Sequence, residues 1–512
     1  MRRQLCSLSF CILGATSLHS AQEAASPAKV PAETAKPEAE PKAERSITRH
    51  TARIGGSQLA YTATAGTFIL RDAKSEAWAR MGYTFYTKDG ADGGSRPITF
   101  AFNGGPGSSS IWLHMGVLGP RRVATPNAEF APPAPYKLVD NDESILDVSD
   151  LVMIDPVGTG FSKALGKAAN KDFWTVDSDI ESMSRFIAQF TGEAGRWNSP
   201  KYLLGESYGT TRGAAIADYT QSNLGLAFNG VVLVSVAMDL ESIFDFPGNE
   251  RPFPMFLPTY TAVAAYHHAL PTEPNNLTAL LEEARAFAMG PYAAALAKGD
   301  QLSDGELDAV AQRLHAFTGL SVDYLKADRL RVRPGQFRQE LLRSRGLTVG
   351  RIDARFTGPN QNAMAESAPW DPQGNAVGPA FSAAFMDYLN RELKFGEGKD
   401  YQVSGRDIFQ SWDFKHKVGT ATQQMVNTTP DLTHALLTNP HLRVLVLNGL
   451  TDLATPFLAT EYTMNHLGLP PAYRSHVEMK YFDSGHMMYL HEPELKQMKA
   501  EVAGFIKRTL HP

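Results

Sequence analysis

Cysteine is nearly absent from this sequence. Of 512 residues only two are cysteines, Cys6 and Cys11, and both lie at the extreme N-terminus. If that segment is removed, the mature chain has no thiol, which excludes disulfides, Cys-ligated metals and a cysteine nucleophile. The 14 histidines are scattered, without H-E-x-x-H or comparable spacing, so neither a metal site nor a cofactor is predicted.

An excess of charge of one sign is also lacking. The chain has 49 Lys and Arg residues against 54 Asp and Glu, which gives a net charge of −5. Nothing therefore favours a polyanionic partner, and no nucleic-acid binding is predicted. A hydrophobic content of 43% and a charged content of 20% are typical of a soluble globular protein, and the length allows a large core.

The only apolar stretch near the N-terminus, residues 5–18, is too short to span a bilayer comfortably. Because Arg2 and Arg3 precede it, it predicts a signal peptide over residues 1–21, with a frayed N-terminus as the alternative. The protein is then exported, periplasmic or extracellular, with no integral membrane segment after signal removal. Residues 22–46 are rich in Ala, Pro, Glu and Lys and predict a disordered linker, because they have little apolar surface to bury.

Short apolar runs typical of buried strands alternate with helical patterns in the rest of the chain. Such runs occur at 97–102, 150–155, 201–204, 230–236 and 442–447. This alternation predicts an α/β protein with a mixed, mostly parallel central sheet and helices on both faces. We expect the core in two parts, residues 47–238 and 413–512.

Helical patterns dominate between the two core parts. They occur at 277–289, 292–298, 305–318 and 380–393. Residues 239–412 are therefore predicted to be a largely helical cap insertion, whose interior would decide which substrates fit.

The sequence Gly205-Glu206-Ser207-Tyr208-Gly209 lies between an apolar strand and a helical segment, as in the G-x-S-x-G nucleophile elbow. The tight turn is expected to hold Ser207 in a strained backbone conformation, with its Oγ above the sheet and the Tyr208 amide toward a developing oxyanion. The pentapeptide alone can arise by chance as an ordinary turn, so the assignment depends on finding partners for the serine.

A second glycine-rich loop follows the strand at 97–102, with the sequence Asn103-Gly104-Gly105-Pro106-Gly107-Ser108-Ser109-Ser110. Its glycines allow backbone N–H groups to approach a ligand closely. A phosphate cradle is the alternative, but no Gly-Lys-Ser/Thr follows and no ribose-binding acid is placed for a nucleotide. In an α/β-hydrolase this loop supplies the second oxyanion donor.

An acyl-transfer serine needs a base and an acid that orients the base. α/β-Hydrolases place them in the order Ser, Asp, His, each near the carboxyl end of a strand. Here Asp452 follows one buried strand and His486 the next, which predicts a triad with Ser207. Asp239 is an alternative acid and His491 an alternative base.

Four motifs resemble the signature blocks of the serine carboxypeptidase family, which has the α/β-hydrolase fold, and they occur in the family's order. They lie at 103–109, 155–162, 205–209 and 485–486. The resemblance covers roughly residue 90 to the C-terminus, including the large insertion before the Asp.

The resemblance implies a role for each matching residue. Ser207 is the nucleophile, His486 the general base and then acid, and Asp452 the residue that orients the base. The backbone amides of Gly105 and Tyr208 form the oxyanion hole.

Asn103, the Gly104 amide and Glu206 bind the C-terminal carboxylate of the substrate, again by resemblance. Two carboxylates side by side repel each other unless one holds a proton, so we expect a raised pKa for Glu206 and peptide binding that favours acidic pH.

The chain departs from the family pattern at several positions. Val117 stands where the family has a second Glu, Ala101 where it has a Trp, and Leu450 where it has the first Asp of Gly-Asp-x-Asp. The cysteines of the eukaryotic members are absent. We therefore expect a divergent bacterial member in which the need for a free substrate carboxylate is weakened.

The sequence thus favours an exported serine carboxypeptidase that acts on a peptide or small acyl substrate. An esterase or acyltransferase with the same triad is the first alternative, favoured by Val117 and Ala101. A non-catalytic binding protein on the same fold is the second. The oligomeric state is left open, with a homodimer among the options.

Overall fold

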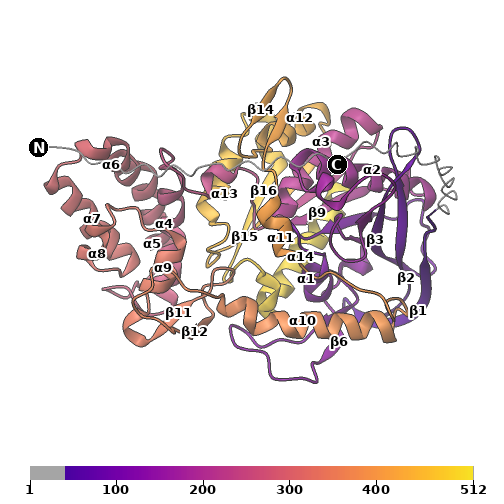
Figure 1. The fold of residues 1–512 in the computed structure, drawn as a ribbon, viewed down its shortest axis with the longest axis horizontal. Coiled ribbons are helices and arrows are strands. Elements are labelled where there is room, and N and C mark those ends of the chain that lie inside the picture. Colours follow the sequence, from indigo (N-terminus) through magenta and orange to yellow (C-terminus); the bar gives the residue numbers. More distant parts are fainter. Residues whose placement is uncertain (1–40, 511–512) are drawn as a thin grey trace, which may run out of the picture. The chain divides into compact units, whose positions relative to one another are not determined.

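A ten-stranded mixed sheet forms the centre of the fold in the computed structural model, which describes residues 41–510 (Figure 1). The predicted signal peptide, and the predicted linker up to residue 40, lie outside the described residues. The strands, in spatial order, are β1 (Arg45–Ile54), β2 (Ser57–Arg71), β3 (Ala77–Lys88), β7 (Asp150–Ile154), β4 (Ile98–Phe102), β9 (Lys201–Glu206), β10 (Gly230–Val234), β15 (Arg443–Gly449) and β16 (Val477–Phe482), with β8 (Lys163–Ala164) beside β3. Strand β1 begins two residues before the predicted start at residue 47.

The direction of the strands changes across the sheet. Strands β1, β2, β3 and β7 pair antiparallel, whereas β7, β4, β9, β10, β15 and β16 pair parallel. The carboxyl ends of the parallel strands meet at one edge of the sheet. Ser207, Asp452 and His486 follow β9, β15 and β16, so the topology brings all three to this edge.

Alternating side chains of the central strands fill a core on each face of the sheet. Leu203 and Val231 belong to the first apolar cluster, and Leu204 and Val232 to the second. The central strands are buried on both faces, and their sequences are therefore continuous apolar runs. The predicted fold class is confirmed by this arrangement.

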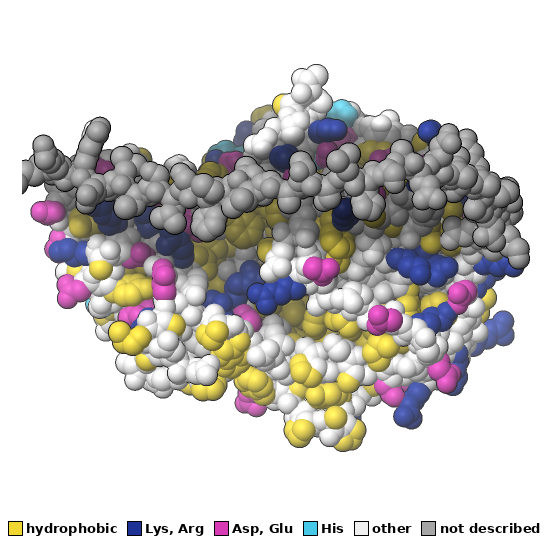
Figure 2. All heavy atoms as spheres, in the orientation of Figure 1, with side chains coloured by type: hydrophobic (Ala, Val, Ile, Leu, Met, Phe, Trp, Pro, Cys, Tyr) yellow, Lys and Arg dark blue, Asp and Glu magenta, His cyan; other side chains and the backbone are white. Residues whose placement is uncertain are grey.

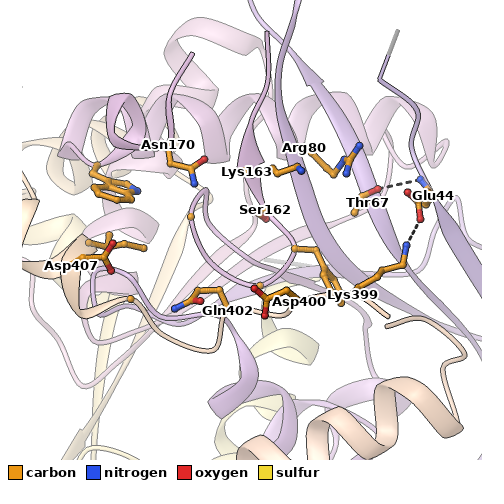
Figure 3. Close-up of a pocket in the computed structure, with 16 residues that line it drawn as sticks. Glu44, Thr67, Arg80, Ser162, Lys163, Asn170, Lys399, Asp400, Gln402 and Asp407 are labelled. Atoms are coloured by element: carbon orange, nitrogen blue, oxygen red, sulfur yellow. Dashed lines mark hydrogen bonds and ion pairs between the residues drawn. The ribbon is translucent and has the colours of Figure 1, made fainter. Parts of the chain in front are cut away.

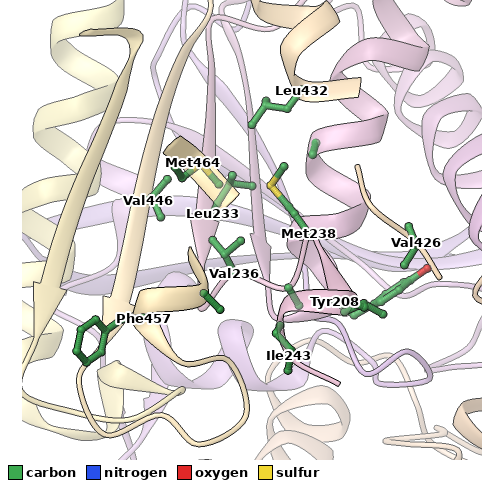
Figure 4. Close-up of a cluster of buried hydrophobic side chains, with 14 of the residues drawn as sticks. Tyr208, Leu233, Val236, Met238, Ile243, Val426, Leu432, Val446, Phe457 and Met464 are labelled. Carbon is green, nitrogen blue, oxygen red and sulfur yellow. The ribbon is translucent and has the colours of Figure 1, made fainter. Parts of the chain in front are cut away.

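Helices cover both faces. The first cluster includes side chains of α2 (Val176–Glu193), α3 (Tyr208–Leu224), α12 (Thr429–Thr438) and α13 (Phe457–Asn465). Figure 4 shows part of it, with Leu233 and Val446 from the sheet and Leu432 and Met464 from α12 and α13. The second cluster includes α1 (Ile111–Leu113), α10 (Pro372–Arg391) and α14 (Glu492–Thr509).

The insertion predicted at 239–412 is mainly helical. It contains α4 (Pro252–Tyr266), α5 (Leu277–Phe287), α6 (Ala293–Lys298), α7 (Asp304–Thr318), α8 (Val322–Ala327), α9 (Pro334–Glu340), α10, α11 (Arg406–Ser411) and the paired strands β11 (Leu347–Val349) and β12 (Thr357–Pro359). Helix α4 packs against α5 and α7 within the insertion and against α13 outside it. The exact domain boundaries stay predictions.

Helix α10 begins eight residues before the predicted start at residue 380. Asp371 caps it, because its Oδ1 accepts the Gly374 amide at 3.0 Å, and Pro372 occupies the first turn, where no amide donor is needed. Pro379 lies inside the helix, one residue before the predicted start. Two further strand pairs complete the described structure, β5 (Arg121–Val123) with β6 (Leu138–Asp140) and β13 (His416–Val418) with β14 (Ala421–Gln423).

Basic and acidic side chains are both spread over the face shown in Figure 2, in keeping with the small net charge. Among the described helices, none combines the length and apolar character needed to cross a bilayer.

Candidate active site

Ser207 occupies a strained turn between β9 and α3. Its backbone has φ +61° and ψ −129°, which a residue with a side chain rarely adopts, and its amide donates to the Val234 carbonyl at 2.9 Å. A side chain at Gly205 would overlap the backbone of Gly209, so only glycine fits there. The predicted elbow geometry is therefore present, with the serine where strand meets helix.

The glycine-rich loop after β4 lies directly against this elbow. A Cβ at Gly104 would overlap the amide nitrogen of Tyr208, and Gly105 has φ +107°. The Tyr208 amide is the first of α3 and has no acceptor within the helix. The structure thus places the Gly105 and Tyr208 backbones beside Ser207, and their role as oxyanion donors stays a prediction.

The imidazole of His486 is held by Asp452. Nδ1 of His486 lies 2.7 Å from Oδ2 of Asp452, whose carboxylate is fully buried. That carboxylate also accepts the Ala454 amide at 2.7 Å, the Thr455 amide at 2.9 Å and the Thr455 hydroxyl at 2.6 Å. These donors fix the position of the carboxylate, so Asp452 can orient the ring.

Burial opposes protonation of His486, but the charge and hydrogen bond of Asp452 outweigh it, so the pKa of His486 is raised. A base with a raised pKa binds the serine proton more firmly once it has accepted it.

Ser207 and His486 line one cavity of about 230 Å³. Among residues 41–510, no hydrogen bond joins the Ser207 hydroxyl to His486. Catalytic hydrogen bonds are often long without substrate and shorten when it binds. The cavity also has apolar walls, formed by Trp112, Val377 and Met487.

Glu206 lines the same cavity, although its side chain is buried and only 3% exposed. Asn103 donates its Nδ2 to Oε1 of Glu206 at 2.7 Å, and Oδ1 of Asn103 accepts the Leu113 amide at 3.0 Å. Oε2 of Glu206 has no hydrogen-bond partner in the described structure. Burial raises the pKa of Glu206 to about 7, against the opposing effects of His486, Tyr489 and Asn103.

Tyr489 lies beside Glu206 and was not identified from the sequence. A Cβ at Gly116 would overlap its ring, so the absence of a side chain there makes room for the tyrosine. The Tyr489 hydroxyl is buried and outside hydrogen-bond geometry, yet close enough to lower the pKa of Glu206. Val117, at the position of the family's second Glu, is buried in the apolar core. The only sequence signal for Tyr489 is its place three residues after His486.

The alternative acid and base lie elsewhere. Asp239 accepts a hydrogen bond from Nη1 of Arg251 at 3.0 Å and caps a short helical turn. His491 lines a separate cavity with Arg355 and Asp483. The structure therefore pairs His486 with Asp452 and leaves Asp239 and His491 outside the cavity of Ser207.

A segment of the insertion passes between the two loops that carry Asp452 and His486. The Leu453 amide donates to the Arg351 carbonyl at 3.0 Å. The His486 amide donates to the Ile352 carbonyl at 2.8 Å. No motif in the sequence marks this segment, because its contacts join residues about 100 positions or more apart.

A larger cavity, of about 600 Å³, is lined by none of the predicted triad residues. It includes Gly158, Gly160 and Ser162 of the second signature motif, and Figure 3 shows basic and acidic side chains around it. Lys399 pairs with Glu44 across it. Among the described residues, no group of three or more His, Cys, Asp or Glu side chains is arranged to hold a metal ion.

Residues 70–232 match the protein family described as serine carboxypeptidase. The match includes the glycine-rich loop and the elbow, and it confirms the resemblance drawn from the motifs. Together with the fold, it supports a serine hydrolase. No curated protein was found to match the chain.

Several solved structures are similar to this chain at low identity. A proline iminopeptidase from Mycobacterium smegmatis is 16% identical, with 87% of this chain and 98% of that chain covered and a TM-score of 0.37. A thermostable carboxyl esterase from Bacillus coagulans is 11% identical, with coverages of 88% and 99% and a TM-score of 0.35. A juvenile hormone epoxide hydrolase from the silkworm Bombyx mori is 12% identical, with coverages of 88% and 79% and a TM-score of 0.32. At these TM-scores the likenesses carry no argument about function.

Proposed function

We propose, from the match of residues 70–232 to the serine carboxypeptidase family, that this protein is an exported serine carboxypeptidase that releases C-terminal residues from peptides. The observation that supports this most directly is the placement of Glu206. A buried carboxyl group with a free oxygen and a pKa of about 7 lines the same cavity as Ser207. A protonated carboxyl group there can donate a hydrogen bond to the terminal carboxylate of a peptide.

The reaction begins when the Ser207 hydroxyl attacks the carbonyl carbon of the last peptide bond and His486 Nε2 takes its proton. Asp452, bound to Nδ1, stabilises the imidazolium that forms. The amides of Gly105 and Tyr208 receive the oxyanion. His486 then protonates the leaving amine, and the C-terminal residue departs from an acyl-enzyme on Ser207.

Deacylation follows the same path in reverse. A water molecule gives a proton to His486 and attacks the acyl carbonyl, and the imidazolium returns the proton to the Ser207 oxygen. During both steps Asn103 keeps Glu206 oriented through the 2.7 Å hydrogen bond to Oε1. Oε2 is buried and has no hydrogen-bond partner in the described structure, so a substrate that reaches it finds an unsatisfied polar group.

An esterase or acyltransferase is the second candidate, and Val117 favours it. A buried valine occupies the position of the family's second Glu, so Glu206 has no second carboxyl group at this position with which to share a proton. Such an enzyme would use the same triad without requiring a free carboxylate.

Blocked dipeptides and their C-terminal amides separate the two candidates. A carboxypeptidase cleaves the free acid faster, and its preference decreases as the pH rises through about 7, where Glu206 loses its proton. Equal turnover of acid and amide at pH 5 would contradict the proposal and favour the esterase. Export is tested by recovering the protein from the periplasm or the medium and sequencing its N-terminus.

A further inference from the structure

We propose that Arg351 binds an anionic group of the substrate, so that the enzyme prefers substrates with a carboxylate near the bond that is cleaved. This inference rests on the proposed hydrolysis at Ser207. It assigns a specificity role to a residue of the insertion that matches no motif.

Arg351 lines the cavity that also contains Ser207 and His486. Its backbone is held on both sides, because its amide donates to Oδ2 of Asp371 at 2.6 Å and its carbonyl accepts the Leu453 amide at 3.0 Å. The next residue along the chain accepts the His486 amide. The backbone of Arg351 is therefore fixed beside the catalytic loops, and its guanidinium is close enough to His486 for its charge to lower the pKa of the imidazole.

The guanidinium of Arg351 has no hydrogen bond or ion pair with any residue from 41 to 510. Neither Asp353 nor Asp371 forms an ion pair with this guanidinium. Asp353 is paired with Arg355 at 2.6 Å, and Asp371 lies 3.5 Å from Arg338. An unpaired arginine is common on a protein surface, but this one lines the cavity of the nucleophile, where it is available to a ligand.

The cavity has three titratable side chains in its wall, those of Glu206, Arg351 and His486. Burial raises the pKa of Glu206 to about 7, so below that pH Glu206 is mostly neutral. Arginine stays charged at any pH of interest. At acidic pH the charged side chains that line the cavity are therefore cationic. Asp452, bound to Nδ1 of His486, offsets the charge of the imidazolium, which leaves the Arg351 guanidinium as the group that attracts an anion.

The chemistry of the guanidinium favours a carboxylate. Its planar N–H groups match the two oxygens of a carboxylate, and such charged hydrogen bonds are stronger than neutral ones. Arg351 itself is exposed, and the apolar walls formed by Trp112, Val377 and Met487 belong to the same cavity. The carboxylate can be the C-terminus of a peptide or the side chain of an Asp or Glu residue.

The test compares wild type with Arg351→Gln, Arg351→Lys and a control, Arg474→Gln, which changes an exposed arginine outside this cavity. Three substrate pairs differ only in one carboxylate. They are a blocked dipeptide acid with its amide, blocked peptides with Glu or Gln next to the cleaved bond, and the p-nitrophenyl esters of succinate and butyrate.

For each pair the readout is the ratio of kcat/KM for the charged substrate to kcat/KM for the neutral one. We expect Arg351→Gln to lower this ratio about tenfold or more in at least one pair, because it loses a charged hydrogen bond. Arg351→Lys should recover part of the loss, and Arg474→Gln should match wild type. The pair that responds identifies the carboxylate as terminal or side chain.

Unchanged ratios in Arg351→Gln for all pairs would overturn the role of Arg351. If wild type cleaves no peptide but the ester pair still depends on Arg351, the carboxypeptidase proposal fails and this one stands. If wild type turns over neither peptides nor esters, both proposals are wrong. Raising the salt concentration should also reduce the ratio in wild type. A ratio that changes neither with salt nor in Arg351→Gln counts against anion binding.

Discussion

Arg355 donates two hydrogen bonds to Oδ2 of Asp353, from Nη2 at 2.6 Å and from Nε at 3.0 Å. Both side chains are buried. The Thr451 hydroxyl donates to Oδ1 of Asp353 at 3.0 Å. Nη2 of Arg355 also lies 2.8 Å from the Ser484 hydroxyl. This ion pair from the insertion therefore joins the loop of the predicted acid to the loop of the predicted base.

Replacing one member of the pair should be strongly destabilising. Arg355→Met leaves the Asp353 charge buried without its partner, and we expect a loss of about 3–5 kcal/mol in the free energy of unfolding, measured with urea. The double variant Asp353→Leu/Arg355→Met should recover part of it, because neither charge is then buried.

Arg391→Met is the matched control for this experiment. It breaks an exposed ion pair with Asp387 on α10, so its cost should stay below about 1 kcal/mol. If Arg355→Met costs no more than this control, the ion pair is not what joins the two loops.

The close approach of the insertion to the His486 loop can be tested at Gly485. A Cβ there would lie 2.5 Å from Cα of Asp353, so Gly485→Ala must displace one backbone from the other. We expect lower stability and a fall in kcat of about tenfold or more for any ester substrate, because misplacement of a catalytic base by about 1 Å is costly.

Gly378→Ala provides the control, because nothing lies within 4 Å of its added methyl group in α10. Alanine is the better helix former, so this variant should be equally or more stable, by up to about 1 kcal/mol. A fully active and stable Gly485→Ala variant would show that the two segments are not in contact as described.

The protonation of Glu206 predicts a pH-dependent stability. Its pKa is about 7 in the folded protein against an ordinary value of 4.5, so the folded state binds the proton more tightly than the unfolded chain. The stabilisation is complete below pH 4.5 and is lost as the pH rises to 7, by roughly 3 kcal/mol at about 1.36 kcal/mol for each pKa unit.

Glu206→Gln should abolish this loss. Urea unfolding at pH 5 and pH 8 should show a smaller decline for the variant than for wild type, by roughly 2–3 kcal/mol, because part of the effect is already lost at pH 5. Glu283→Gln, at an exposed position on α5, is the control and should decline as wild type does. Equal declines in all three proteins would mean that Glu206 is ionised in the folded state at pH 5.

The parts of the site that the sequence predicted are those that depend on local pattern. The elbow of Ser207 has its own motif, and the order of Asp452 and His486 follows from the parallel strands before them. Arg351 reaches the site through contacts between distant segments, and Tyr489, although close to His486 in sequence, meets Gly116 and Glu206 in the same way. Such contacts leave no periodic signal, so sequence analysis could not place either residue.

In the fold too, elements with a local sequence pattern were predictable and elements held by distant contacts were not. Buried strands such as β10 were recognisable as short continuous apolar runs. The start of α10 was not, because the helical pattern was recognised only from residue 380, whereas Ala376 and Val377 in the earlier turns pack in the second apolar cluster and hold the helix. Tertiary packing decided the structure there, over local propensity.

The most direct test of the account is covalent labelling of the folded wild-type protein with a fluorophosphonate, followed by peptide mass spectrometry. The account predicts a single modified residue, Ser207, with labelling abolished in Ser207→Ala and slowed by about a thousandfold or more in His486→Ala. An unlabelled folded protein, or a label on another serine, would contradict the assignment of Ser207 as the nucleophile.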